Sequence, residues 1–69
     1  MRDPNRIDKY CERLAAMWKK VPDWRFGQLL SNLLGRYIAE TSNDIFFPED
    51  EDMFAALEYV MDEIMNGNP

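Results

Sequence analysis

Residues 26–40 read FGQLLSNLLGRYIAE, and they carry the clearest helical pattern in the chain. Their apolar side chains recur at intervals of three and four residues, which places them on one face of an α-helix. Asp23 precedes the pattern, and its carboxylate can accept hydrogen bonds from the free N–H groups of a first turn. We therefore predict a helix over residues 24–40 with an apolar face formed by Phe26, Leu29, Leu30, Leu33, Leu34, Tyr37 and Ile38.

A second helix is predicted before it, over residues 4–20. Asp3 and Pro4 favour a helix start, because aspartate can cap the first turn and proline fits the first helical position without a wasted donor. Pro22 prevents continuation. The apolar face of this helix is formed by Ile7, Tyr10, Cys11, Leu14, Met17 and Trp18.

A third helix is predicted over residues 49–65. Pro48 and the acidic residues 49–52 favour its start, and Asn66 with Gly67 supplies a left-handed stop. Residues 45–47 (Ile-Phe-Phe) are too apolar to remain in water, so we expect an extended segment tucked under the bundle between the second and third helices. The apolar face of the third helix is formed by Met53, Phe54, Leu57, Val60, Met61, Ile64 and Met65.

The length and composition fit a single small domain. The chain has 69 residues, of which 46% are apolar and 30% charged, and this balance is typical of a globular protein. The predicted fold is all-α, a three-helix bundle over residues 1–69, and its core is small enough that we expect modest stability.

Several function classes are disfavoured. No histidine is present, which removes the commonest general base and zinc ligand, and no motif for a nucleotide, metal or other cofactor occurs. We therefore expect no enzyme activity, no catalytic or metal site and no cofactor. Apolar runs do not exceed five residues, Cys11 is alone, and the first residues do not resemble a secretion signal. These features predict a cytoplasmic protein without a membrane partner.

The charge is divided along the chain. Residues 1–40 hold all eight basic side chains against five acidic ones, whereas residues 41–69 hold eight acidic side chains and no basic one. Arg2, Arg6, Lys9 and Arg13 form a stripe that we expect to be solvated or to neutralise acids on a neighbouring helix. Direct nucleic-acid binding is disfavoured, because so small a basic patch lies beside so acidic a segment.

The third helix offers a candidate partner-binding surface. Once the core positions are removed, Tyr59 stands among carboxylates and alanines, and an aromatic ring within a charged rim is typical of a protein-binding spot. A tyrosine that covers its own helix or the 41–48 loop is the alternative. Near the end of this helix, the negative charges of Asp62 and Glu63 oppose the helix dipole, and no lysine compensates them. The candidate partner-binding residues are Asp50, Glu51, Asp52, Glu58, Tyr59, Asp62 and Glu63.

Small residues form a ridge on the second helix. Gly27, Ser31, Gly35 and Ala39 lie four apart, and such a ridge lets another backbone approach closely. Each helical glycine costs about 1 kcal/mol relative to alanine, so the ridge requires an explanation. We expect packing against another helix of the same chain, with a symmetric homodimer as the alternative.

Two sequence blocks carry a resemblance. Residues 21–29 (VPDWRFGQL) and 44–50 (DIFFPED), together with Arg6-Ile7-Asp8 and Trp18, resemble a group of short bacterial and phage or mobile-element proteins that has no established activity. The resemblance implies a setting, small cytoplasmic proteins often carried by mobile DNA, and assigns no functional residue. Small acidic proteins from that setting include inhibitors of host defence nucleases, some of which imitate the charge of DNA.

The sequence therefore predicts a non-catalytic, acidic protein-binding module. Its expected partner is a protein with a basic surface, for example a nuclease or another nucleic-acid-handling host enzyme that it occludes or regulates. The alternative is a homo-oligomeric structural or scaffold domain assembled through the small-residue ridge. Inhibition and activation of the partner both stay open at this stage.

Overall fold

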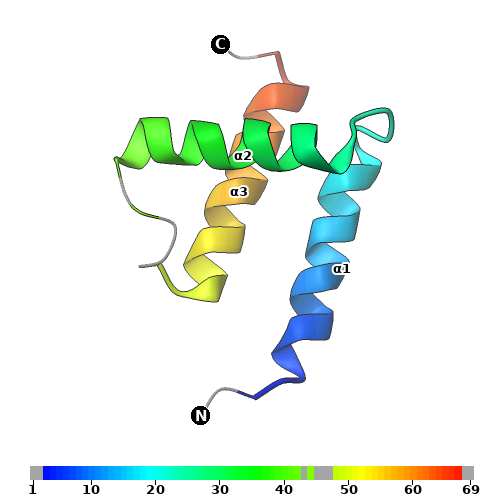
Figure 1. Ribbon diagram of the computed structural model, residues 1–69, viewed down its shortest axis with the longest axis vertical. Coiled ribbons are helices and arrows are strands. Elements are labelled where there is room, and N and C mark those ends of the chain that lie inside the picture. The colour runs from blue at the N-terminus through cyan, green and yellow to red at the C-terminus, as the bar shows by residue number, and fades with distance from the viewer. Residues whose placement is uncertain (1–2, 43, 45–47, 68–69) are drawn as a thin grey trace.

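The computed structural model describes residues 3–42, 44 and 48–67. It contains three α-helices: α1 (Arg6–Lys19), α2 (Phe26–Thr41) and α3 (Asp50–Met65). α1 and α3 run side by side in the same direction, and α2 lies across them (Figure 1). The predicted three-helix bundle is confirmed, and each helix lies within two residues of its predicted bounds. The predicted extended segment at residues 45–47 lies outside the described residues.

Two of the predicted helix starts are corrected by the structure. The carboxylate of Asp3 accepts a hydrogen bond from the Asn5 N–H at 2.9 Å, which stabilises a turn just before α1 rather than the first turn itself. Asp23 is exposed in the α1–α2 turn, and α2 begins three residues later. The cap there comes from Gln28, whose side-chain oxygen accepts from the Arg25 N–H at 2.8 Å. A side chain three residues into the helix thus satisfies the preceding backbone donor, as in a capping box.

The ends of α2 and α3 are closed by left-handed residues. Ser42 has φ 58° and its N–H donates to the Ile38 carbonyl oxygen at 2.8 Å. Gly67, with φ 72°, follows α3 as predicted, because glycine enters this region without steric cost.

The core lies where α2 and α3 meet, with one contribution from α1. Trp18 and Trp24 flank it: the Trp18 indole N–H donates to the Trp24 carbonyl oxygen at 2.8 Å, and both rings pack on the core. The buried core side chains are Met17, Leu29, Leu33, Tyr37, Leu57, Val60 and Met61.

Part of the predicted core is exposed. Ile7 is 51% exposed, Phe26 47%, Ile38 46% and Met65 50%, and Cys11 is also exposed. Because α2 crosses the other two helices, each contact is short, and side chains beyond the crossing stay in water. The total accessible surface is 5131 Å² for a chain of 8.2 kDa, against about 4,500 Å² for a typical monomer of that mass. The three helices therefore cover one another incompletely.

Candidate protein-binding surface

Ion pairs join basic residues of α1 to acidic residues of α3. Arg13 lies at their centre: its guanidinium donates to Glu58 at 2.6 and 2.9 Å and to Glu51 at 2.9 Å. At the first residue of α3, a carboxylate oxygen of Asp50 lies 2.8 Å from the Arg6 Nε. The interpretation of the basic stripe as a neutraliser of a neighbouring helix is thus confirmed for Arg6 and Arg13, while Lys9 is exposed and unpaired within the described residues.

Aromatic rings hold Arg13 in place. Tyr10 and Phe54 stack with ring centroids 4.7 Å apart, and the Arg13 guanidinium carbon lies 5.4 Å from the centre of the Tyr10 ring and 5.5 Å from that of Phe54. Planar arginine suits such stacking and binds a carboxylate through two parallel hydrogen bonds. The hydrogen bond from Arg13 lowers the pKa of Glu58 below its usual value, and the same bond raises the pKa of Arg13.

The acids at the end of α3 are also compensated. The Lys20 Nζ, just after α1, lies 3.4 Å from Asp62, and Arg36 of α2 lies 3.4 Å from Glu63. The prediction that Asp62 and Glu63 oppose the helix dipole without a compensating base was therefore wrong. The bases come from other helices, which the order of residues along α3 could not show.

The candidate partner-binding residues consequently divide into two groups. Asp50, Glu58 and Glu63 are half-buried and turned toward α1 or α2, so their predicted outward position is corrected. The outward group consists of Glu51, Asp52, Tyr59 and Asp62, all of which are exposed.

Tyr59 lies at the centre of that outward group. Tyr59 is 62% exposed, the largest value among the exposed large hydrophobic residues, so most of its surface is accessible to a partner. Asp52 and Ala55 lie seven and four residues before Tyr59, and Asp62 lies three residues after it. These spacings place all four residues on the same side of α3. We call these four residues the Tyr59 face. Asp52 forms no ion pair within the described part of the chain, and Asp62 is 64% exposed despite its contact with Lys20.

The small-residue ridge faces solvent. Gly27, Ser31, Gly35 and Ala39 are all exposed, and a Cβ added at Gly27 or Gly35 would meet no atom within 4 Å. The expected packing of this ridge inside the monomer was therefore wrong. The reason is that α2 docks through Leu29, Leu33 and Tyr37, which lie on the opposite side of the helix.

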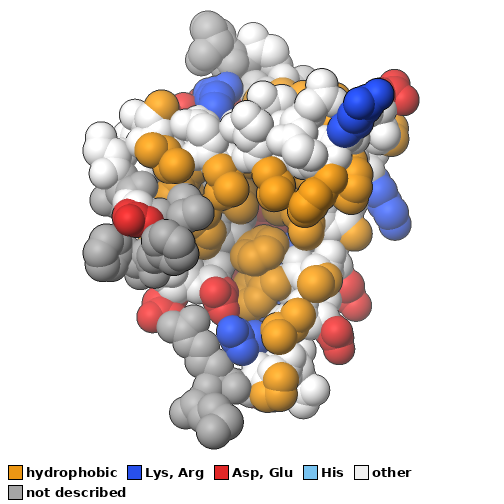
Figure 2. All heavy atoms as spheres, viewed as in Figure 1, with side chains coloured by type: hydrophobic (Ala, Val, Ile, Leu, Met, Phe, Trp, Pro, Cys, Tyr) orange, Lys and Arg blue, Asp and Glu red, His pale blue; other side chains and the backbone are white. Residues whose placement is uncertain are grey.

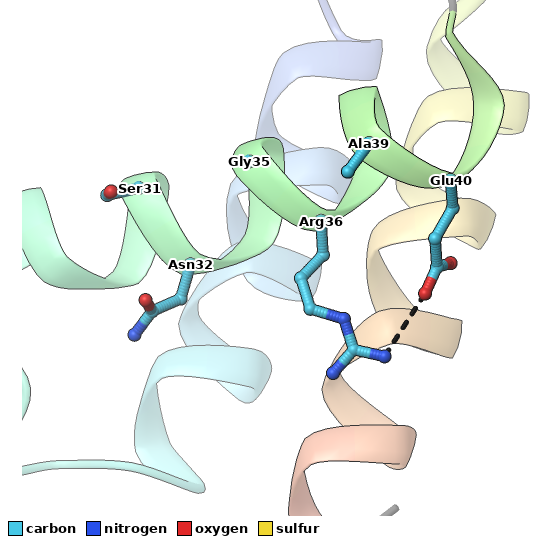
Figure 3. Close-up of a pocket in the computed structure, with 6 residues that line it drawn as sticks. All are labelled: Ser31, Asn32, Gly35, Arg36, Ala39 and Glu40. Atoms are coloured by element: carbon cyan, nitrogen blue, oxygen red, sulfur yellow. Dashed lines mark hydrogen bonds and ion pairs between the residues drawn. The ribbon is translucent and has the colours of Figure 1, made fainter. Parts of the chain in front are cut away.

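A shallow hollow follows the ridge. It is lined by Ser31, Asn32, Gly35, Arg36, Ala39 and Glu40. In Figure 3 the small residues lie along one side of α2, while Arg36 extends toward α3. Arg36 also lies 3.1 Å from Glu40, so the two charged side chains of α2 neutralise each other at the flank of the ridge.

Neither a cluster of metal ligands nor a membrane-spanning helix occurs among the described residues. Within residues 3–42, 44 and 48–67, no group of three Cys, Asp or Glu side chains is placed to hold a metal ion. None of the three described helices combines the length and the apolar character that crossing a membrane requires.

Sequence reasoning missed Arg13 as the central residue of the α1–α3 interface. A signal for it was present: Arg6, Arg13 and Lys20 recur every seven residues, and so do Glu51 and Glu58. Matching heptad spacings on two helices indicate a row of side chains that can meet along a shared seam.

Comparison of the chain with protein-family models, with curated proteins and with solved structures found no match.

Proposed function

We propose that this chain is a non-catalytic protein-binding module and that its Tyr59 face contacts a basic surface on a larger protein. The observation that carries this proposal is the exposure of Tyr59, at 62%, between carboxylates that are themselves exposed. The ring provides apolar area for a pocket on the partner, and tyrosine is enriched among residues that dominate binding energy. The acidic rim steers a cationic partner and sets its orientation.

The acids contribute unequally to this surface. Asp52 has its full charge available, since it has no partner within the described residues, and Asp62 and Glu51 are 64% and 59% exposed. Asp50, Glu58 and Glu63 are half-buried and bind the bundle together, so they act on the partner only through the field of the whole molecule. A formal net charge of −5 adds to the attraction over distances comparable with the Debye length, about 8 Å at physiological salt.

The class of partner follows from the charge. A protein that binds nucleic acid has a basic surface, and an acidic module can occupy that surface in place of phosphates. An inhibitor or regulator of a nucleic-acid-handling enzyme, such as a host nuclease, is the specific form of the proposal. It rests on the resemblance of the two sequence blocks to mobile-element proteins.

Affinity capture from host lysate tests the proposal. The tagged protein is used at low salt after nuclease treatment, beside a Tyr59→Ala, Asp52→Lys variant, and captured proteins are identified by mass spectrometry. We expect one basic protein that elutes with salt and is lost with the variant. An Asp23→Lys control makes the same charge change on the exposed α1–α2 turn and should retain it. Equal recovery with all three baits contradicts the proposal.

A second candidate function is self-assembly through the small-residue ridge. The observation that favours it is that a Cβ at Gly27 or Gly35 would meet no atom within 4 Å, so no contact with the described residues accounts for two helical glycines. In an antiparallel pair of α2 helices, Gly27 would lie opposite Ala39 of the second copy, and Ser31 opposite Gly35, as two-fold symmetry requires.

Sedimentation equilibrium tests self-assembly. A dimer that forms with concentration and is abolished by Gly35→Leu supports this function, provided that Ala16→Leu, an equally large change at an exposed site on α1, leaves it intact. A monomer at every accessible concentration removes it.

A further inference from the structure

A second surface, separate from the Tyr59 face, follows the side of α1 that the ion pairs leave uncovered. Ile7, Cys11, Ala15 and Trp18 recur at intervals of four, four and three residues, which aligns them along one side of the helix. We call these four residues the α1 stripe. Ile7 is 51% exposed, Cys11 and Ala15 are exposed, and Trp18 is half-buried. The described residues leave the stripe open from Ile7 to Ala15, whereas the Trp18 ring packs on the core and against Phe26.

The stripe has a hollow at each end. One hollow, in the groove between α1 and α3, is lined by Ile7, Tyr10, Cys11, Leu14 and Phe54, with the Arg6–Asp50 ion pair at its edge. The other is lined by Ala15, Trp18, Lys19 and Pro22. Figure 2 shows hydrophobic side chains gathered between α1 and α3 beneath α2. This apolar concave surface is what a docked side chain could fill.

The shape and chemistry of this surface favour a helix as its occupant. The walls are helices whose interior backbone N–H and C=O groups are already hydrogen-bonded, so an extended peptide would find no backbone partners there and would lose its bonds to water. An amphipathic helix satisfies its own backbone and presents an apolar row of matching period. From Ile7 to Trp18 the stripe spans eleven residues, about 17 Å, which matches about three turns of a docked helix.

The charge around the stripe favours a basic occupant. Asp8 and Glu12 are exposed beside it on α1, and neither forms an ion pair within the described residues. Arg6 and Arg13, the bases nearest the first hollow, already bind acids of α3. Lys19, which lines the second hollow, is a single base against the two acids. A second copy of the chain is disfavoured as the occupant, because it brings another −5 charge and acidic outer residues on α3.

We propose that the α1 stripe is a docking site for a cationic amphipathic helix of another protein, with apolar side chains in the two hollows and basic ones beside Asp8 and Glu12. The site is separate from the Tyr59 face, and its test does not depend on the proposed function of that face.

Cys11 makes the proposal directly testable, because the single cysteine of the chain lies within the stripe. The rate at which iodoacetamide alkylates Cys11 is measured with increasing amounts of an 18-residue Leu/Lys peptide whose leucines recur every three and four residues. We expect saturable protection that slows alkylation at least tenfold. A scrambled peptide of the same composition, and a Leu/Glu peptide with the same apolar face, should leave the rate unchanged.

Stripe variants assign the protection to this surface. Ile7→Glu adds a charge at a half-exposed position, so it should keep the helical circular dichroism spectrum while it abolishes protection. Ala15→Glu, at the other hollow, serves as the second variant if Ile7→Glu unfolds. Ile38→Glu makes the same kind of change on α2, where Ile38 is 46% exposed, and should retain protection.

Three results would overturn the proposal. One is the absence of protection at any peptide concentration, and another is equal protection by the Leu/Glu peptide. The third is slowing of alkylation with protein concentration alone, which would identify the occupant as a second copy of the chain.

Discussion

Among the described polar side chains, Arg13 makes the most hydrogen bonds across the α1–α3 interface. It binds two carboxylates of α3 and lies against the stacked Tyr10 and Phe54 rings, so the pair is ordered by packing as well as by charge. Exposed ion pairs contribute little on average, but bidentate geometry against aromatic surfaces is the exception.

Arg13→Met is expected to lower the free energy of unfolding, because it removes the guanidinium to which both Glu51 and Glu58 are hydrogen-bonded. Urea denaturation measures the change. Lys9→Met removes one positive charge from an exposed, unpaired position on the same helix, and it should cost clearly less. Equal costs would show that the ion pairs of Arg13 do not stabilise the bundle.

The pKa of Glu58 gives the stability a pH dependence. Because that pKa is lower in the folded protein than its unfolded value near 4.5, the unfolded state binds more protons in between, and stability rises with pH. The contribution is complete above pH 4.5 and is lost as pH falls through the folded pKa. Thermal unfolding between pH 3 and 6 should therefore show a smaller acid-induced loss in Glu58→Gln than in the wild type. An identical loss in both proteins would contradict this assignment.

At the scale of the helices, Gly35 tests the exposed position of the small-residue ridge. Alanine at this site gains helix propensity and meets no atom within 4 Å, so Gly35→Ala should stabilise the monomer by about 0.4–1 kcal/mol. Gly67 has φ 72°, and Gly67→Ala should destabilise instead. Chemical denaturation at low protein concentration measures both changes. A destabilising Gly35→Ala would place the ridge in contact with another helix.

The elements themselves were predictable, while their mutual arrangement was not. Apolar spacing located all three helices, because a helix repeats its side chains at a fixed period whatever its neighbours are. The capping role of Gln28 was missed, since Asp23 offered a stronger local signal. The docking face of α2 was predicted, since Leu29, Leu33 and Tyr37 belong to its predicted apolar face. The further expectation that the small-residue ridge packs inside the monomer was wrong, because the ridge lies on the opposite side of α2. The order of charges along the chain gives the total charge of α3. It does not show which carboxylates are neutralised by bases of other elements, because that pairing depends on how the helices cross.

At the scale of the molecule, the core is small and concentrated. Met61 is completely buried at the crossing of α2 and α3, so Met61→Ala should cost about 2–5 kcal/mol, which is a large part of the stability of a domain this size. Met65, one turn later, is 50% exposed, and Met65→Ala should change the stability by about 0.5 kcal/mol or less. Comparable effects on the thermal midpoint of the two variants would contradict the position of the core.

The arrangement of charge in the whole molecule connects fold and function. Five carboxylates of α3 bind bases of α1 and α2 or the α1–α2 turn, so much of the charge division along the sequence is used to hold the bundle together. What stays available on α3 is the Tyr59 face. The central claim is therefore that a cationic partner finds this face rather than the acidic helix as a whole.

A nuclear magnetic resonance titration of the ¹⁵N-labelled protein with a short Lys/Arg peptide tests that claim most directly. The account predicts that the largest amide shifts occur at Asp52, Ala55, Tyr59 and Asp62. It also predicts that they shrink with Tyr59→Ala and disappear near 1 M salt, where the Debye length is about 3 Å. Shifts of equal size at Asp23 and Glu40, unchanged in Tyr59→Ala, would contradict it.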